Sequence, residues 1–170
     1  RSFVGQYPIP YVYGMTCGEF AEMLNNEGWL DGGKKCRLSV VKMENWKRWM
    51  HWENTTLPWV LTSPHIPNPE TALYYSAIGM LGELEAVNIG VGYTMPFQLV
   101  GQEWINGAQL ADALNAKKIP GVFFRQVSFK PYYGKQMDKQ LSGVQIQITD
   151  KSRINLTNIQ FHVIEALIVL

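Results

Sequence analysis

Apolar positions recur at helical spacing in the first half of the chain, between residues that start and stop helices. Thr16 and Glu19 have the spacing of a capping box, which predicts a helix that runs from there to Gly28. One face of this helix carries Cys17, Phe20, Ala21 and Leu24. Asn68, followed by a proline at the first helical position, predicts a second helix that stops near Gly82.

Two further helices are predicted in the second half of the chain. Asn106 and Gln109 cap the first of them, and Pro120 follows its last turn. Thr157, with Gln160 three residues on, starts the second, which runs into the apolar end of the chain. That end carries no stop signal, so we expect a fragment cut at both ends. Its exposed apolar face at residues 163–170 would form a homodimer or contact a missing segment.

Strand-like segments lie between these helices. They are "CRLSVVKM" (36–43), "GVFFRQVSFKPY" (121–132) and "GVQIQITD" (143–150). In the last segment Val144, Ile146 and Ile148 share one face, as in a half-exposed sheet. Helices and strands interleave without strict alternation, which predicts an α+β fold. We expect a mixed sheet packed with several helices, in a single domain over residues 1–170.

Charge and composition narrow the possible partners. The chain has 15 basic and 14 acidic residues, for a net charge of +1, and no patch that would attract nucleic acid. No apolar run reaches the length of a membrane span. Cys17 and Cys36 lack zinc-ligand spacing, and His51, His65 and His162 are dispersed, so we expect no metal and no cofactor. Two buried free thiols are favoured over a disulfide.

The stretch "GELEAVNIGVGYTMPF" (82–97) combines carboxylates with closely spaced glycines. It contains neither a nucleophile elbow nor a phosphate-binding loop. Gly90 and Gly92 favour a structural turn with positive φ or a close backbone approach. Glu83 and Glu85 are the paired carboxylates that a glycosidase needs, although exposed Glu pairs are common for other reasons. At this point both are candidates for a catalytic role.

Four tryptophans cluster between residues 46 and 59. Trp46, Trp49, Trp52 and Trp59 could stack on sugars, cations or lipid headgroups. The usual burial of large aromatic side chains favours the alternative that Trp46 and Trp49 cover the edge of a core.

Six separated blocks occur in the order of a known family. They include "SFVGQYPIPYVYGMTCGEFAEMLN", "MENWKRW", "SPHIPNPETALYY", "PFQLVGQEWI" and "FKPYYGKQMDKQLSGVQIQITD". With these blocks the chain resembles the bacterial exo-β-N-acetylmuramidase (NamZ) family, formerly a domain of unknown function. The resemblance covers essentially the whole chain and indicates most of a C-terminal lobe, with a Rossmann-like N-terminal lobe absent.

The resemblance implies the activity and the site. Family members remove terminal N-acetylmuramic acid from peptidoglycan fragments in a cleft between two lobes, with the best catalytic candidates in the absent lobe. This chain alone would then be inactive. Glu83 matches the Glu before the family's glycine-rich segment, so the resemblance makes it the candidate catalytic residue. Lys135 matches a Lys after the family's Pro-x-Phe turn. The substrate-binding residues that we expect are His65, Asn68, Glu83, Asn88, Gln98 and Lys135.

The glycine-rich segment departs from the family. The usual Ser-Glu-Gly-Arg-Gly-Thr falls on residues 88–93, where Ile89 and Val91 replace the Glu and the Arg. This loss of two charged groups leaves two functions open: a glycoside hydrolase for peptidoglycan-derived or other amino sugars, or a non-catalytic glycan-binding or assembly protein. The cell-wall substrates of the family imply the periplasm or the exterior, with the cytoplasm as the alternative.

Overall fold

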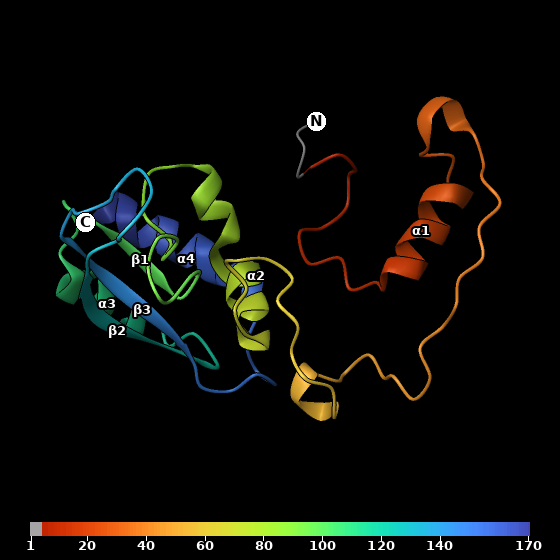
Figure 1. Ribbon diagram of the computed structural model, residues 1–170. Helices are drawn as coiled ribbons and strands as arrows, with labels where there is room; N and C mark the ends of the chain where they lie inside the picture. Colours follow the sequence, from red (N-terminus) through yellow and green to blue (C-terminus); the bar gives the residue numbers. More distant parts are fainter. Residues whose placement is uncertain (1–4) are drawn as a thin grey trace. The chain divides into compact units, whose positions relative to one another are not determined.

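The computed structural model describes residues 5–170, which fall into two units. The units are Arg1–Thr56 and Leu57–Leu170, and each is described by itself. The single domain expected over residues 1–170 stays a prediction, because contact density does not measure cooperative unfolding. The first unit contains α1 (Cys17–Asn26) and the short 3-10 helices η1 (Asp31–Gly33) and η2 (Trp52–Asn54). The second contains α2 (Pro69–Glu83), β1 (Leu99–Gln102), α3 (Gly107–Ala116), β2 (Val122–Phe129), β3 (Leu141–Ile148) and α4 (Leu156–Val169) (Figure 1).

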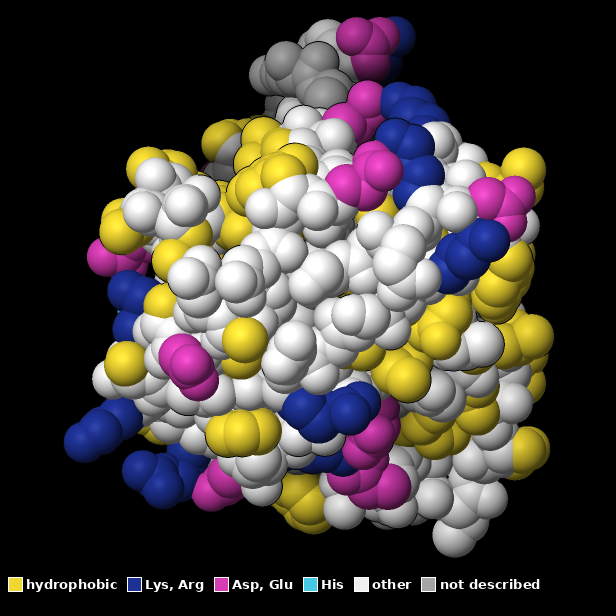
Figure 2. Space-filling view, turned by 90° about the vertical axis from the view of Figure 1, so that its left-hand side faces the viewer, with side chains coloured by type: hydrophobic (Ala, Val, Ile, Leu, Met, Phe, Trp, Pro, Cys, Tyr) yellow, Lys and Arg dark blue, Asp and Glu magenta, His cyan; other side chains and the backbone are white. Residues whose placement is uncertain are grey.

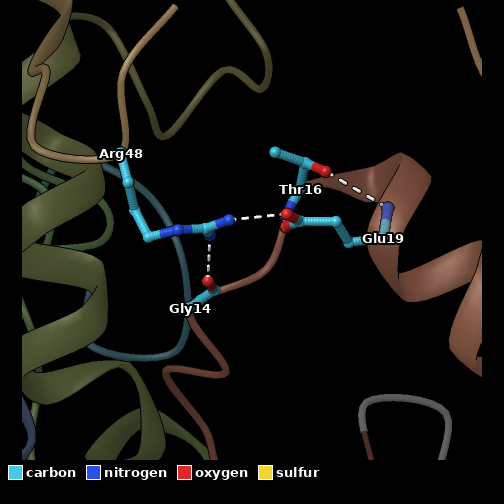
Figure 3. Close-up of polar contacts among 4 residues, drawn as sticks. All are labelled: Gly14, Thr16, Glu19 and Arg48. Atoms are coloured by element: carbon cyan, nitrogen blue, oxygen red, sulfur yellow. Dashed lines mark hydrogen bonds and ion pairs between the residues drawn. The ribbon is translucent and has the colours of Figure 1, made fainter. Parts of the chain in front are cut away.

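The first helix begins as the sequence predicts. The Thr16 hydroxyl accepts a hydrogen bond from the Glu19 N–H at 3.2 Å, and the Glu19 carboxylate accepts one from the Thr16 N–H at 2.7 Å. Arg48 donates to the Gly14 carbonyl and to the same carboxylate (Figure 3), both at 2.5 Å. The Thr16 N–H and the Arg48 guanidinium together lower the pKa of Glu19. The start of α1 is thus held by a polar network.

Two predictions in this unit are wrong. Cys17 and Cys36 are free thiols, as expected, but both are exposed, because none of residues 5–56 is buried. The segment 36–43 is extended, yet it pairs with no strand in the part of the chain that the structure describes. β-branched residues favour an extended backbone, but a strand also requires a hydrogen-bonding neighbour.

The second unit is an antiparallel sheet with helices, which confirms the α+β class. The strand order is β1-β3-β2, and both pairings are antiparallel, so the sheet is not mixed within residues 57–170. The sequence predicted β2 and β3 and missed β1. That strand has four residues, "LVGQ", which is too short for a periodic pattern.

Both faces of the sheet are partly covered. The larger core joins the sheet to α2, α3 and α4, and its fully buried members include Ile78, Leu114, Phe124, Ile146 and Ile159. Leu99, Phe129 and Leu141 form a smaller cluster on the opposite face. The predicted inward orientation of Val144 and Ile146 is confirmed, since both are fully buried.

The helices of this unit begin at the residues that the sequence predicts, except for α4. Asn68 and Asn106 are the N-cap residues of α2 and α3, as predicted. The N-cap of α4 is Asn155 and not Thr157, whose hydroxyl donates to the Asn155 side chain at 3.1 Å instead of accepting a backbone N–H. The last residues, 168–170, are exposed and apolar, and dimerisation through them stays a prediction.

Charges on the surface are mixed, as the composition suggests. On the face in Figure 2, Lys and Arg side chains lie next to Asp and Glu side chains, without a large patch of one sign. Among the residues described, no helix is long and apolar enough to cross a membrane.

Candidate functional site

The candidate site is a pocket of about 400 Å³ in the second unit. Three segments line it: the last turns of α2, the connection from Glu85 to Phe97, and the loop at residues 133–136. The first two follow one another in the chain, whereas the third comes from the connection between β2 and β3. A cavity of this size accommodates a small ligand.

The glycines of the connection allow it to fold tightly at the pocket. Gly90 and Gly92 have φ of 82° and 93°, which confirms the predicted turn. A Cβ atom on Gly90 would collide with the Met95 carbonyl, and one on Gly92 would lie 2.5 Å from the Tyr133 carbonyl oxygen. Gly92 thereby lets the 133–136 loop approach the connection.

Asn88 holds this turn from inside. Its side-chain oxygen accepts a hydrogen bond from the Gly90 N–H at 2.7 Å, and its amide group donates to the Val91 carbonyl at 3.2 Å. Ile89 is 7% exposed and lies so close to Gly82 that a Cβ there would be 2.6 Å from its Cδ1. Ile89 and Val91 therefore form an apolar part of the pocket wall.

The loop at residues 133–136 forms another wall of the pocket, and an ion pair joins it to the residues that follow α2. Lys135 Nζ lies 2.6 Å from Glu85 Oε2, and the hydrogen bond and charge of Lys135 lower the pKa of Glu85. Glu85 has φ of 52°, a left-handed conformation that is uncommon for residues other than glycine. The Tyr132 N–H donates to the Gly92 carbonyl at 2.9 Å and fixes the same wall to the glycine turn.

Aromatic side chains form part of the pocket lining. The Tyr133 hydroxyl is 3.1 Å from His65 Nδ1, and the two rings stack with centroids 6.1 Å apart. Tyr75 meets Phe97 edge to face at 4.9 Å. Tyr75, Phe97 and Tyr133 all line the pocket. Aromatic faces of this kind stack on the apolar faces of sugar rings.

The structure brings together part of the predicted set. Glu83, Asn88 and Lys135 line the pocket, and His65 reaches it through Tyr133. Asn68 does not line it, because its side chain caps α2 through the Thr71 N–H at 3.1 Å. Gln98 does not line it either. Whether any of these residues binds a ligand stays a prediction.

The sequence did not identify Tyr75 and Tyr133 as pocket residues. Tyr75 sits within a helix whose apolar residues predict only packing, and Tyr133 belongs to an irregular loop. A pair of adjacent tyrosines before a glycine was the one available signal in that loop. It carries no information about which part of the fold the loop meets.

Of the four clustered tryptophans, Trp59 is the one in the second unit, and it does not line this pocket. Trp49 is 70% exposed, so the prediction that it covers a core edge is wrong. Trp46 is half-buried, with the Arg48 guanidinium 5.3 Å from its ring. Trp59 donates to the Ile66 carbonyl at 3.3 Å, beside the loop that carries His65.

The charged residues that line the pocket are Glu83, Glu85 and Lys135. Among the described pocket residues, Glu83 is the carboxylate without a hydrogen bond or ion pair, since Glu85 is paired with Lys135. Glu83 is therefore available to accept a hydrogen bond from a hydroxyl group. No group of three His, Cys, Asp or Glu side chains in the described part of the chain could hold a metal ion.

Comparison with known proteins assigns both units to one family. Residues 1–70 match the family model "Exo-beta-N-acetylmuramidase NamZ, N-terminal", and residues 73–170 match the corresponding C-terminal model. A "Peptidoglycan beta-N-acetylmuramidase NamZ" from Bacillus subtilis (strain 168) is 40% identical over 168 residues, which is 98% of this chain and 39% of that protein. The crystal structure of a DUF1343 family protein from Bacteroides fragilis NCTC 9343 is 48% identical. It superposes with a TM-score of 0.93 over 99% of this chain and 43% of that one.

These matches also refine the resemblance read from the sequence. The chain spans about two fifths of the length of the relatives that it matches. The sequence resemblance indicates a C-terminal lobe for the whole chain, whereas residues 1–70 match the N-terminal model. The pocket lies in residues that match the C-terminal model, apart from the adjoining His65.

Proposed function

Because this chain belongs to the exo-β-N-acetylmuramidase NamZ family, we propose that it is part of a glycoside hydrolase that acts on amino sugars derived from peptidoglycan. The observation that carries the proposal is the pocket at the end of α2, with an available carboxylate beside aromatic side chains. Sugar sites commonly combine aromatic faces with a few polar groups that fix the orientation of the ring.

Each side of the proposed site has its own part in binding. Tyr133, oriented by its hydrogen bond to His65, offers a ring face to the sugar. Glu83 accepts a hydrogen bond from a sugar hydroxyl and is the one candidate for proton transfer in this pocket. The Glu85–Lys135 pair closes the outer wall.

A single carboxylate does not complete a glycosidase. Most of these enzymes use two carboxyl groups on either side of the glycosidic bond, and Glu85 is occupied by Lys135. We therefore propose that the second group comes from the part of the family's length that lies outside residues 1–170. It follows that residues 1–170 alone should release no sugar.

The test is hydrolysis of a muramic-acid-terminated disaccharide by a chain of full family length that carries this sequence. We expect release of free N-acetylmuramic acid, and we expect Glu83→Gln to lower kcat/KM about 100-fold or more if Glu83 transfers a proton. Glu103→Gln is the matched control, because Glu103 is exposed and does not line the pocket. Absence of product from the wild-type chain would count against the hydrolase.

A second candidate function is glycan binding without turnover. Ile89 and Val91 place apolar groups on the pocket wall, at the two positions where the family resemblance implies a Glu and an Arg. Calorimetry with muramic-acid disaccharides would favour this function if it shows binding while long incubation yields no product. An absence of binding to any cell-wall fragment would eliminate it.

The proposed substrate also suggests a location. Peptidoglycan fragments are found outside the cytoplasmic membrane, so we propose the periplasm or the exterior for this protein. Cell fractionation that recovers the protein only with cytoplasmic markers would contradict this.

A further inference from the structure

A row of aromatic rings leads from the candidate pocket along the connection between β2 and β3. Tyr133, which lines the pocket, has its ring centroid 5.7 Å from that of Tyr132. The Tyr132 centroid lies 6.2 Å from that of Tyr93, and the Tyr93 centroid lies 5.5 Å from that of Phe129. The row therefore begins at the pocket and ends in the smaller apolar cluster of the sheet, to which Phe129 belongs.

Both ends of this row are fixed to the fold. At the inner end Phe129 is 2% exposed, and Tyr93 packs against the cluster that contains it. At the pocket end the Tyr133 hydroxyl lies 3.1 Å from His65 Nδ1, and the two rings stack with centroids 6.1 Å apart. The rings between these ends therefore keep a defined position without burying all of their surface.

The loop that carries Tyr132 is also held by its own backbone. The Tyr132 N–H donates to the Gly92 carbonyl at 2.9 Å, which attaches the loop to the glycine turn. The Asp138 N–H donates to the Pro131 carbonyl at 3.0 Å, and Lys130 Nζ lies 3.2 Å from Asp138 Oδ1. These contacts close the connection on itself, so Tyr132 stands on a folded loop and not on an extended one.

The Tyr132 ring is fixed in this way and is still open to a ligand. Tyr132 is 56% exposed and Tyr133 is 43% exposed, although large aromatic side chains usually bury most of their surface. The plane of Tyr132 is tilted by 54° from that of Tyr133 and by 43° from that of Tyr93, so its neighbours do not stack flat on it. A ring that is held in place with an open face can stack on the apolar face of a sugar.

We propose that Tyr132 is the platform of a subsite for the second sugar of the substrate, the one next to the terminal N-acetylmuramic acid. This inference rests on the proposed function, because a hydrolase that removes a terminal sugar holds it in the pocket while the rest of the glycan leaves through the opening. A glycan that passes Tyr133 meets the Tyr132 ring next. The exposed pair of Lys130 and Asp138 closes the same loop and offers hydrogen-bonding groups to the hydroxyl and acetamido groups of that sugar.

The test compares two substrates of a chain of full family length that carries this sequence: a muramic-acid-terminated disaccharide, and the methyl glycoside of N-acetylmuramic acid, which has no second sugar. We expect Tyr132→Ala to lower kcat/KM about 3- to 10-fold more for the disaccharide, because only that substrate loses a stacking contact. Tyr132→Phe keeps the ring and should retain the wild-type preference. Trp104→Ala is the matched control, since Trp104 is 60% exposed and does not line the pocket. Equal losses on both substrates would overturn the subsite.

Calorimetry separates a failure of the subsite from a failure of the proposed hydrolase. If the wild-type chain releases no sugar, the hydrolase is refuted, and binding alone then decides about the subsite. We expect the disaccharide to bind more tightly than the methyl glycoside, and Tyr132→Ala to remove most of this difference. Equal affinity of the wild-type chain for the two sugars, or no binding of either, would overturn the subsite.

Discussion

Asn88 offers a sharp test of how the pocket is held together. The replacement Asn88→Ala removes two hydrogen bonds, the one from the Gly90 N–H at 2.7 Å and the one to the Val91 carbonyl at 3.2 Å. Gly90 is buried, so its N–H would be left without a partner and away from water. Two net hydrogen bonds at about 1 kcal/mol each give a loss of about 2 kcal/mol in the free energy of unfolding.

The assay is urea unfolding of residues 1–170, followed by circular dichroism. A loss of this size lowers the urea midpoint by about 1 M and the Tm by about 4–8 °C. Asn88→Asp keeps the acceptor for Gly90 and removes only the donor to Val91, so it should lose about half as much. Asn158→Ala, at an exposed position in α4, should stay within about 0.5 kcal/mol of wild type.

The order of the three stabilities shows whether the Asn88 side chain holds the glycine turn. Our reasoning requires wild type to be most stable, then Asn88→Asp, then Asn88→Ala. If Asn88→Ala unfolds at the wild-type urea concentration, the side chain does not hold the glycine turn. A binding role would then be the better explanation of its position at the pocket.

Three further predictions concern the pocket and the core. Gly92→Ala should destabilise the chain more than Gly134→Ala. Both positions have positive φ, but only at Gly92 would the added Cβ atom lie 2.5 Å from a carbonyl oxygen; equal thermal shifts would refute the close approach. The pKa of Glu85 is depressed in the folded chain by Lys135, so the contribution of this pair is present above the usual value of 4.5 and is lost as the pH falls through the folded pKa. An NMR titration should show that Lys135→Ala raises the pKa of Glu85, and an unchanged pKa would contradict the ion pair. Gln160→Leu should raise the free energy of unfolding by about 1 kcal/mol, because the side-chain oxygen of this buried residue has no hydrogen bond; a destabilised variant would show that the oxygen does find a partner.

The sequence predicted the elements that carry a local signal. The capping box at Thr16, the N-caps Asn68 and Asn106 and the alternation in β3 each involve residues close together in the chain, where hydrogen-bonding chemistry and periodicity act directly. Where the local signal was ambiguous, the prediction failed. Thr157 lies two residues beyond the true cap of α4.

The candidate site could be predicted only in part for the same reason. Glu83 and Asn88 are in one continuous stretch that the glycines marked as a turn. Tyr133 and Lys135 meet that stretch through the pairing of β2 with β3, which returns a distant loop to the end of α2. No pattern within the loop could have specified that contact.

The sequence by itself therefore determined the starts of α1, α2 and α3, the two long strands, the turn at Gly90 and Gly92, and the family resemblance. Only the tertiary structure decided which residues line the pocket, that Asn88 is used inside its own turn, and that residues 37–43 have no partner within residues 5–170. The physical reason is the separation along the chain of the residues that each interaction joins. Caps, periodicity and backbone conformation depend on neighbours in the chain, whereas burial, ladder pairing and ion pairs depend on which distant segments meet.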